Sequence, residues 1–153
     1  MSSVLSYVEF IKTLPQTVVP HLPDRLQVIQ PHQPFRWIIQ FHFGEKRLHY
    51  EVSRVPRTKN LELAFHCESK DKTLNRYLLT GFRRHLFEIH DTLGQQITAE
   101  MWDRGWTKIY EVYPEGELTN DYQEAVGKRL AEIITCLQPI FAQLRQDVRK
   151  IHR

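Results

Sequence analysis

Histidine and glutamate alternate with apolar residues along three short segments in the first half of the chain. The alternating polar residues are Gln40 and His42, then His49 and Glu51, and finally Glu62, His66 and Glu68. Because successive side chains of a strand point to opposite faces of a sheet, these residues are predicted to share one face. Imidazoles and carboxylates on one face can form cross-strand pairs, bind a small ligand or partner, or hold a metal ion. The candidate ligand-binding residues are therefore His42, His49, Glu51, Glu62 and His66.

The register of the strands decides how close these residues come. Antiparallel pairing that keeps the apolar faces together can set His42 opposite His49, and one of two allowed registers sets His49 opposite His66. Neighbouring strands lie about 4.8 Å apart, so such a row of imidazoles would span about 10 Å. Two adjacent imidazoles could share a metal with Glu51, whereas a solvated face of His–Glu pairs needs none. We expect the solvated face, and hence neither a metal nor a cofactor.

Other catalytic motifs are weak. Glu68-Ser69-Lys70 matches the end of the nuclease-type PD-(D/E)XK pattern, but no second acidic residue stands in the loop where that pattern needs one, and helix capping explains the same residues. Cys67 and Cys136 lie in no C-x-x-C pair, and no phosphate-binding or nucleophile motif occurs. The motifs therefore leave open whether the chain is an enzyme.

A second candidate site is basic and aromatic. Three arginines of a predicted helix lie off its apolar stripe, and two tryptophans flank the turn at Arg104, where cations and aromatic rings can contact a nucleic acid. These nucleic-acid-binding candidates are Arg76, Arg83, Arg84, Trp102 and Trp106. The formal net charge of +3 is too small to imply a nucleic-acid partner by itself.

The elements that must position these residues follow from hydrophobic periodicity. Alternation with a period of two predicts strands, and a spacing of three and four predicts helices. The predicted strands are 36–43, 47–54, 61–68, 96–102 and 107–113, and the predicted helices begin at Ser2 or Ser3, at Ser69 or Asp71, and at Thr119 or Asn120. The order α-β-β-β-α-β-β-α indicates an α+β fold, an antiparallel sheet of about five strands with helices on one face. Its expected core includes Phe65, Leu78, Phe82, Ile89, Leu130 and Leu137.

Two segments stand out within what is predicted to be a single domain over residues 1–153. Residues 15–34 contain five prolines, which predicts an extended connector. The final helix carries an apolar stripe from Tyr122 to Ile151, so it would be about 50 Å long and would overhang a body of about 40 Å. The residues expected to protrude are Ile140, Leu144, Val148 and Ile151. Either the helix bends at Pro139, or a homodimer covers the stripe, and we expect the homodimer.

The composition points to a soluble protein of the cytoplasm. No run approaches 18 apolar residues, the N-terminus lacks the features of a signal peptide, and the two cysteines form no disulfide framework. We therefore expect a reducing compartment and no membrane partner.

A pattern of apolar and small residues covers just over half of the chain. It comprises 61–65, Asn75, Leu78, Leu79, Arg83, Glu88-Ile89, Leu93-Gly94 and Met101-Trp102, followed by a strand and an amphipathic helix. Between Leu61 and Leu144 this pattern resembles an uncharacterised bacterial domain that is often appended to nuclease-like or restriction-related proteins. The resemblance implies an accessory or binding module associated with DNA restriction or defence. The alternatives are a metal-dependent hydrolase or nuclease-like enzyme that uses the His/Glu face, and a nucleic-acid-binding protein.

Overall fold

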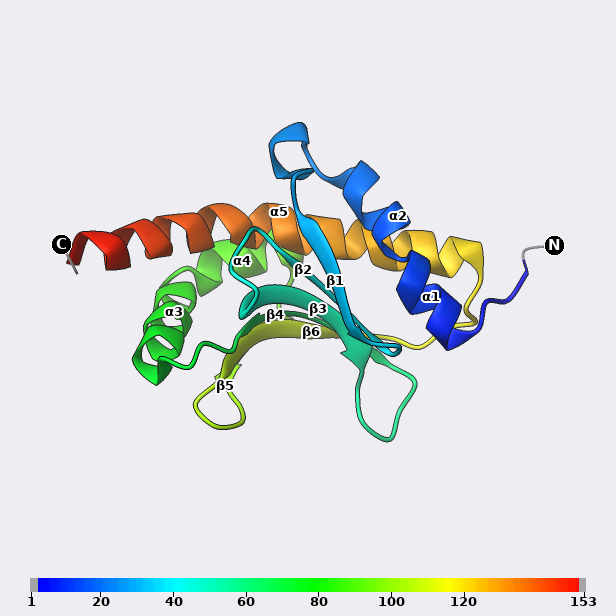
Figure 1. The fold of residues 1–153 in the computed structure, drawn as a ribbon, viewed down its shortest axis with the longest axis horizontal. Coiled ribbons are helices and arrows are strands. Elements are labelled where there is room, and N and C mark those ends of the chain that lie inside the picture. Colours follow the sequence, from blue (N-terminus) through cyan, green and yellow to red (C-terminus); the bar gives the residue numbers. More distant parts are fainter. Residues whose placement is uncertain (1–2, 152–153) are drawn as a thin grey trace.

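Six antiparallel strands form one sheet, and helices pack against one of its faces (Figure 1). This is a computed structural model that describes residues 3–151. The strands are β1 (Gln30–Phe35), β2 (Ile38–His42), β3 (Leu48–Arg54), β4 (Leu61–Cys67), β5 (Thr98–Met101) and β6 (Thr107–Tyr113), in the spatial order β1-β2-β3-β4-β6-β5. The helices are α1 (Tyr7–Thr13), α2 (Pro15–Val18), α3 (Lys72–Arg84), α4 (Leu86–Leu93) and α5 (Asn120–Ile151). The predicted α+β class is confirmed, with six strands instead of about five.

Period-two alternation explains which face of the sheet is apolar. Tyr50 pairs with Phe65, which in turn pairs with Ile109, and all three side chains are buried against the helices. Phe65 lies in contact distance of Phe141 on α5, with ring centroids 5.0 Å apart. The expected core residues all belong to one buried cluster: Phe65, Leu78, Phe82, Ile89, Leu130 and Leu137. Because the apolar face is fixed in this way, the alternating polar residues must lie on the opposite face.

The proline-rich segment is more ordered than the extended connector that the sequence predicts. Residues 15–34 contain α2, two turns of 3-10 helix and most of β1. Pro15 starts a helix, where a missing amide hydrogen does no harm. Pro31 and Pro34 lie in β1, which is an edge strand that pairs only with β2. An edge strand tolerates proline because one side of its backbone needs no partner, and this explains the sixth strand.

The predicted middle helix is two helices. The chain leaves helical geometry at His85, with φ −102° and ψ 8°, between α3 and α4. Phe82 before the break and Ile89 after it are both buried in the core. The apolar stripe therefore looks continuous in the sequence, although the helix is interrupted. No proline or glycine marks the position.

The first helix starts later than predicted. Ser6 caps α1, because its side chain accepts a hydrogen bond from the backbone N–H of Glu9. The predicted cap Ser3 precedes the helix, and Ser2 lies outside the described residues. Phe10 and Ile11 are buried and attach the helix to the core.

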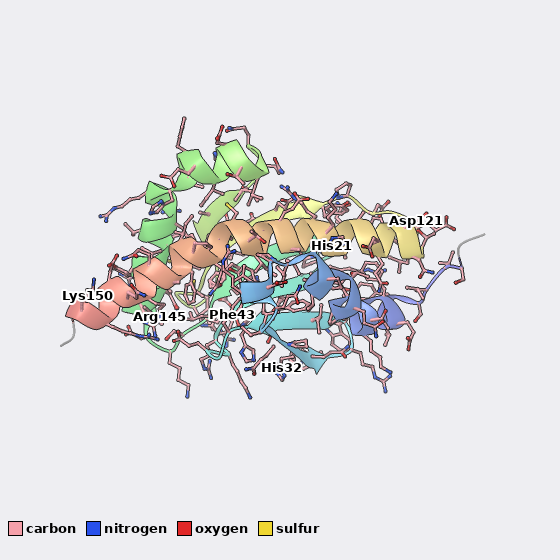
Figure 2. The ribbon with its side chains drawn as sticks, turned by 90° about the horizontal axis from the view of Figure 1, so that it is seen from above. His21, His32, Phe43, Asp121, Arg145 and Lys150 are labelled. Carbon is pink, nitrogen blue, oxygen red and sulfur yellow. The ribbon has the colours of Figure 1, made fainter. Side chains whose placement is uncertain are left out.

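The last helix is one continuous element that contains Pro139 (Figure 2, from Asp121 to Lys150). Leu144 is buried, and its side chain packs so closely on Gly81 of α3 that a Cβ at that position would clash with it. Ile140 also packs against the core cluster. The prediction that Leu144 protrudes is therefore wrong, because α3 covers it, and Ile140 and Val148 are partly buried. The side chain of Ile151 lies outside the described ones. The homodimer stays a prediction.

Among the described residues, no helix combines the length and the apolar character that crossing a membrane requires.

Candidate metal centre and adjoining pocket

The polar face of the sheet lies on the side away from α5, where the strands arch between two projecting hairpin loops (Figure 1). His49 on β3 pairs directly with His66 on β4, and His66 pairs with Lys108 on β6. This confirms the register that places the two imidazoles side by side. Their side chains are buried, with 2% of His49, 4% of His66 and 7% of Glu51 exposed. The prediction of a solvated face is therefore wrong, and each polar group must find a partner inside the protein.

His66 is surrounded by carboxylates. Its Nε2 atom lies 3.0 Å from Glu62 Oε1, and its Nδ1 atom lies 3.0 Å from Glu68 Oε2 and 3.6 Å from Glu51 Oε2. Burial disfavours the charged imidazolium, but the hydrogen bonds to Glu62 and Glu68 and the charge of Glu51 outweigh it and raise the pKa of His66 to about 9. His66 is therefore a cation at neutral pH, and the surrounding carboxylates balance its charge.

The neighbouring carboxylates are held ionised. Burial of Glu51 disfavours its charged form, yet a hydrogen bond from His49, the charge of His66 and a hydrogen bond from Gln40 keep the pKa of Glu51 below its usual value. Burial also disfavours the charged form of Glu62, but hydrogen bonds from His66 and Lys108 outweigh this effect and keep the pKa of Glu62 below its usual value. The face therefore carries fixed negative charge next to its two imidazoles.

His49 is hydrogen-bonded through both ring nitrogens. Its Nδ1 atom lies 2.8 Å from the backbone carbonyl of Lys46. A carbonyl oxygen only accepts, so Nδ1 carries a hydrogen. The other ring nitrogen, Nε2, faces Glu51 Oε1 at 3.3 Å and Glu68 Oε1 at 3.8 Å.

Two imidazoles and two carboxylates form a closed ring, which we call the His/Glu ring: His49, Glu51, His66 and Glu68. Each carboxylate presents one oxygen to each imidazole, at separations of 3.0, 3.3, 3.6 and 3.8 Å. Ligand atoms about 2.0–2.1 Å from a tetrahedral ion lie about 3.3–3.4 Å from each other. Ligand atoms of His49, His66 and Glu68 also lie within 4.8 Å of one another. Three side chains of the ring, His49, His66 and Glu68, thus lie close enough together to share one ion.

His42 is not part of the ring. Its Nδ1 atom accepts a hydrogen bond of 3.0 Å from the backbone N–H of Gly44, where β2 ends. Burial, followed by the charge of Lys46, lowers the pKa of His42. The β2–β3 ladder runs to the pair Phe41–Tyr50, one residue short of His42 and His49. Of the five predicted ligand-binding residues, the structure brings four together, and His42 instead stabilises a turn.

A pocket of about 560 Å³ adjoins the ring on the same face. Glu51 and His66 belong to both the ring and the pocket wall. The remaining lining residues are Tyr7, Trp37, Ile38, Ser53, Arg54, Pro56, Glu62, Trp102 and Lys108. The pocket therefore combines aromatic rings and charged groups next to the buried imidazoles.

The predicted nucleic-acid-binding residues fall into separate places. Trp102 lies on the polar face, with its ring centroid 5.4 Å from that of His66 and 5.4 Å from that of Trp106. Arg83 donates hydrogen bonds of 3.2 and 3.0 Å to the carbonyl of Ala99, on the edge strand β5. Arg76 and Arg84 are exposed on α3. The guanidinium of Arg83 is thus already engaged within the chain, and a nucleic-acid partner stays a prediction.

Two residues of the site were not among the sequence-based candidates. Glu68 continues the alternation two residues after His66, so the period of two was a usable signal for it. Lys108 donates a hydrogen bond of 3.0 Å to Glu62 Oε2. Its position depends on the pairing of β4 with β6, which are separated along the chain by two helices and β5. No local pattern specifies that pairing.

No protein-family model, curated protein or solved structure matched this chain. The resemblance to a bacterial accessory domain therefore stays a prediction.

Proposed function

We propose that the protein binds a divalent transition-metal ion at the His/Glu ring. The ligand atoms would be Nε2 of His49, Nδ1 of His66 and carboxylate oxygens of Glu68 and Glu51. This proposal replaces the sequence-based expectation of a solvated face without a metal.

One observation carries the proposal: both imidazoles are anchored through the nitrogen that faces away from the ring. Nδ1 of His49 donates to the carbonyl of Lys46, and Nε2 of His66 donates to Glu62, which also accepts a hydrogen bond from Lys108. A metal-binding histidine almost always donates its other ring N–H to a carbonyl or a carboxylate. This arrangement supports the assignment of the remaining two nitrogens as ligands.

The chemistry of the ring selects the kind of metal. Two imidazoles with two carboxylates suit zinc, manganese or ferrous iron better than a soft ion that prefers thiolates. The two carboxylates compensate the charge of a divalent ion in a buried position. The proton that links His66 to its carboxylates leaves when the ion binds.

Metal titration of the purified protein tests the proposal. Protein stripped with a chelator is titrated calorimetrically with Zn²⁺, with Mn²⁺ and, without oxygen, with Fe²⁺, and bound metal is measured by elemental analysis. We expect one ion per chain, and His49→Ala should weaken binding about 100-fold or more, since it removes a ligand.

His32→Ala is the matched control, because His32 is an exposed histidine on β1. It should bind metal like the original protein, and circular dichroism should show that both variants are folded. The absence of stoichiometric binding by any of the three ions, or equal binding by the two variants, would refute the proposal.

A further inference from the structure

Two tryptophans of the pocket expose large aromatic surfaces. Trp37 is 57% exposed and Trp102 is 40% exposed, although both line the pocket. Phe35 stacks on Trp37, with centroids 5.7 Å apart and planes within 8° of parallel. Exposed indole rings at a pocket are typical of sites that bind a flat ring by stacking.

The pocket also contains a cation without an acidic partner. Among residues 3–150, Arg54 forms no salt bridge, and its guanidinium lies 3.9 Å from the centroid of the Tyr7 ring. The planar guanidinium can form two parallel hydrogen bonds to a phosphate or a carboxylate. Arg54 is therefore available to bind an anionic group.

The carboxylates of the pocket are already occupied. Glu62 contacts His66 through one oxygen and Lys108 through the other. Glu51 contacts Gln40 and His49 through Oε1 and faces His66 through Oε2. Arg54 and Lys108 are the cationic side chains of the wall outside the His/Glu ring, and Arg54 makes no salt bridge among residues 3–150. The polar groups of the pocket that remain free are mainly N–H donors, and N–H donors bind an anion better than a cation.

We propose that this pocket binds a small ligand that combines a flat aromatic ring with an anionic group, such as a nucleoside monophosphate. The ring would stack on Trp37 or Trp102, and the anion would contact Arg54 and Lys108. A volume of about 560 Å³ suits a ligand of this size. The inference is independent of the proposed metal, since Arg54, Lys108 and both tryptophans lie outside the His/Glu ring.

Binding to the metal-free protein tests this inference. Adenosine monophosphate, adenosine and inorganic phosphate are titrated in the presence of a chelator, with tryptophan fluorescence and calorimetry as readouts. Benzoate and benzamide form a second pair, which shows whether a carboxylate can replace the phosphate. We expect at least one anionic ring compound to bind 10-fold or more tightly than its uncharged counterpart and than phosphate.

Variants separate the pocket from the metal centre. Arg54→Ala should weaken binding of the anionic compound about 10-fold or more and leave Zn²⁺ binding unchanged. Lys59→Ala removes an equal charge from an exposed position in the β3–β4 loop and should change neither. Equal binding of charged and uncharged compounds, no binding of any, or equal effects of the two substitutions would overturn the inference, whatever the outcome for the metal.

Discussion

His49 and His66 are direct cross-strand partners in the middle of the sheet, with ring centroids 5.5 Å apart and both side chains buried. Burying two titratable groups side by side is unfavourable unless charges or an ion compensate them. Glu51 and Glu68 provide that compensation from both sides. The pair is thus the structural centre of the face, and the following predictions test it and the fold that holds it.

The hydrogen bond between Glu62 and His66 should tune metal affinity. Glu62→Gln removes the negative charge that orients and polarises His66, so we expect Zn²⁺ affinity to fall about 10- to 100-fold. Competition with a chromophoric chelator measures this change. Glu100→Gln is the control, because Glu100 on β5 accepts from Tyr110 and lies outside the His/Glu ring. Equal losses in the two variants would contradict the role of Glu62.

In the metal-free protein, His66 should titrate near pH 9. The groups that face it are Glu51 from β3, Glu62 and Glu68 from β4 and its strand end, the paired His49, Lys108 from β6 and Trp102. Its pKa is raised above the ordinary 6.5 to about 9. The stabilisation from this shift is therefore complete below about pH 6.5 and is lost as the pH rises through about 9.

Two measurements check the titration. The pKa is measured by NMR of the imidazole, and stability is measured by urea unfolding at pH 6 and pH 10 in the presence of a chelator. His66→Gln should lose less stability between the two pH values than the original protein does. An imidazole that titrates below pH 7 would show that the carboxylates do not stabilise its charge.

The buried aromatic cluster should dominate the stability of the fold. Phe82 is fully buried against Phe65, with ring centroids 5.7 Å apart. We expect Phe82→Ala to lower the free energy of unfolding by about 3–5 kcal/mol. Phe87→Ala removes the same ring from an 86% exposed position on α4 and should change stability by less than about 0.5 kcal/mol. Denaturant unfolding of both variants distinguishes a core position from a surface one.

Arg83 should contribute to stability through the edge strand. Its guanidinium donates two hydrogen bonds to the carbonyl of Ala99. Because the group is exposed, we expect Arg83→Ala to reduce stability by only about 1 kcal/mol. The neighbouring Arg84→Ala should have no measurable effect, since Arg84 is exposed and forms no salt bridge within residues 3–150. Equal unfolding midpoints for the two variants would contradict a structural role for Arg83.

Periodicity predicted the middle of the sheet well. The predicted strand 107–113 matches β6, and the alternation around His49 and His66 placed both on one face. One apolar face excludes a slip by a single residue, because such a slip would bury the polar side chains on the helix side. It does not exclude a slip by two, and this is why the sequence alone left two registers open.

Features that depend on distant parts of the chain were not predictable. The burial of His49 and His66 depends on Glu51, Glu68 and Trp102, which three different segments bring together. The break at His85 satisfies the same apolar spacing as a continuous helix would. The local pattern fits either an exposed or a buried His/Glu face, and either one helix or two helices around His85. Tertiary packing selects between them.

X-ray absorption spectroscopy of the protein loaded with one Zn²⁺ tests the central claim most directly. The account predicts a first shell of four nitrogen and oxygen atoms at about 2.0–2.1 Å, with the outer-shell scattering of two imidazoles. His49→Ala should remove one imidazole contribution, whereas His32→Ala should leave the spectrum unchanged. A first shell that contains sulfur at about 2.3 Å, or one without imidazole scattering, would place the metal elsewhere and contradict the account.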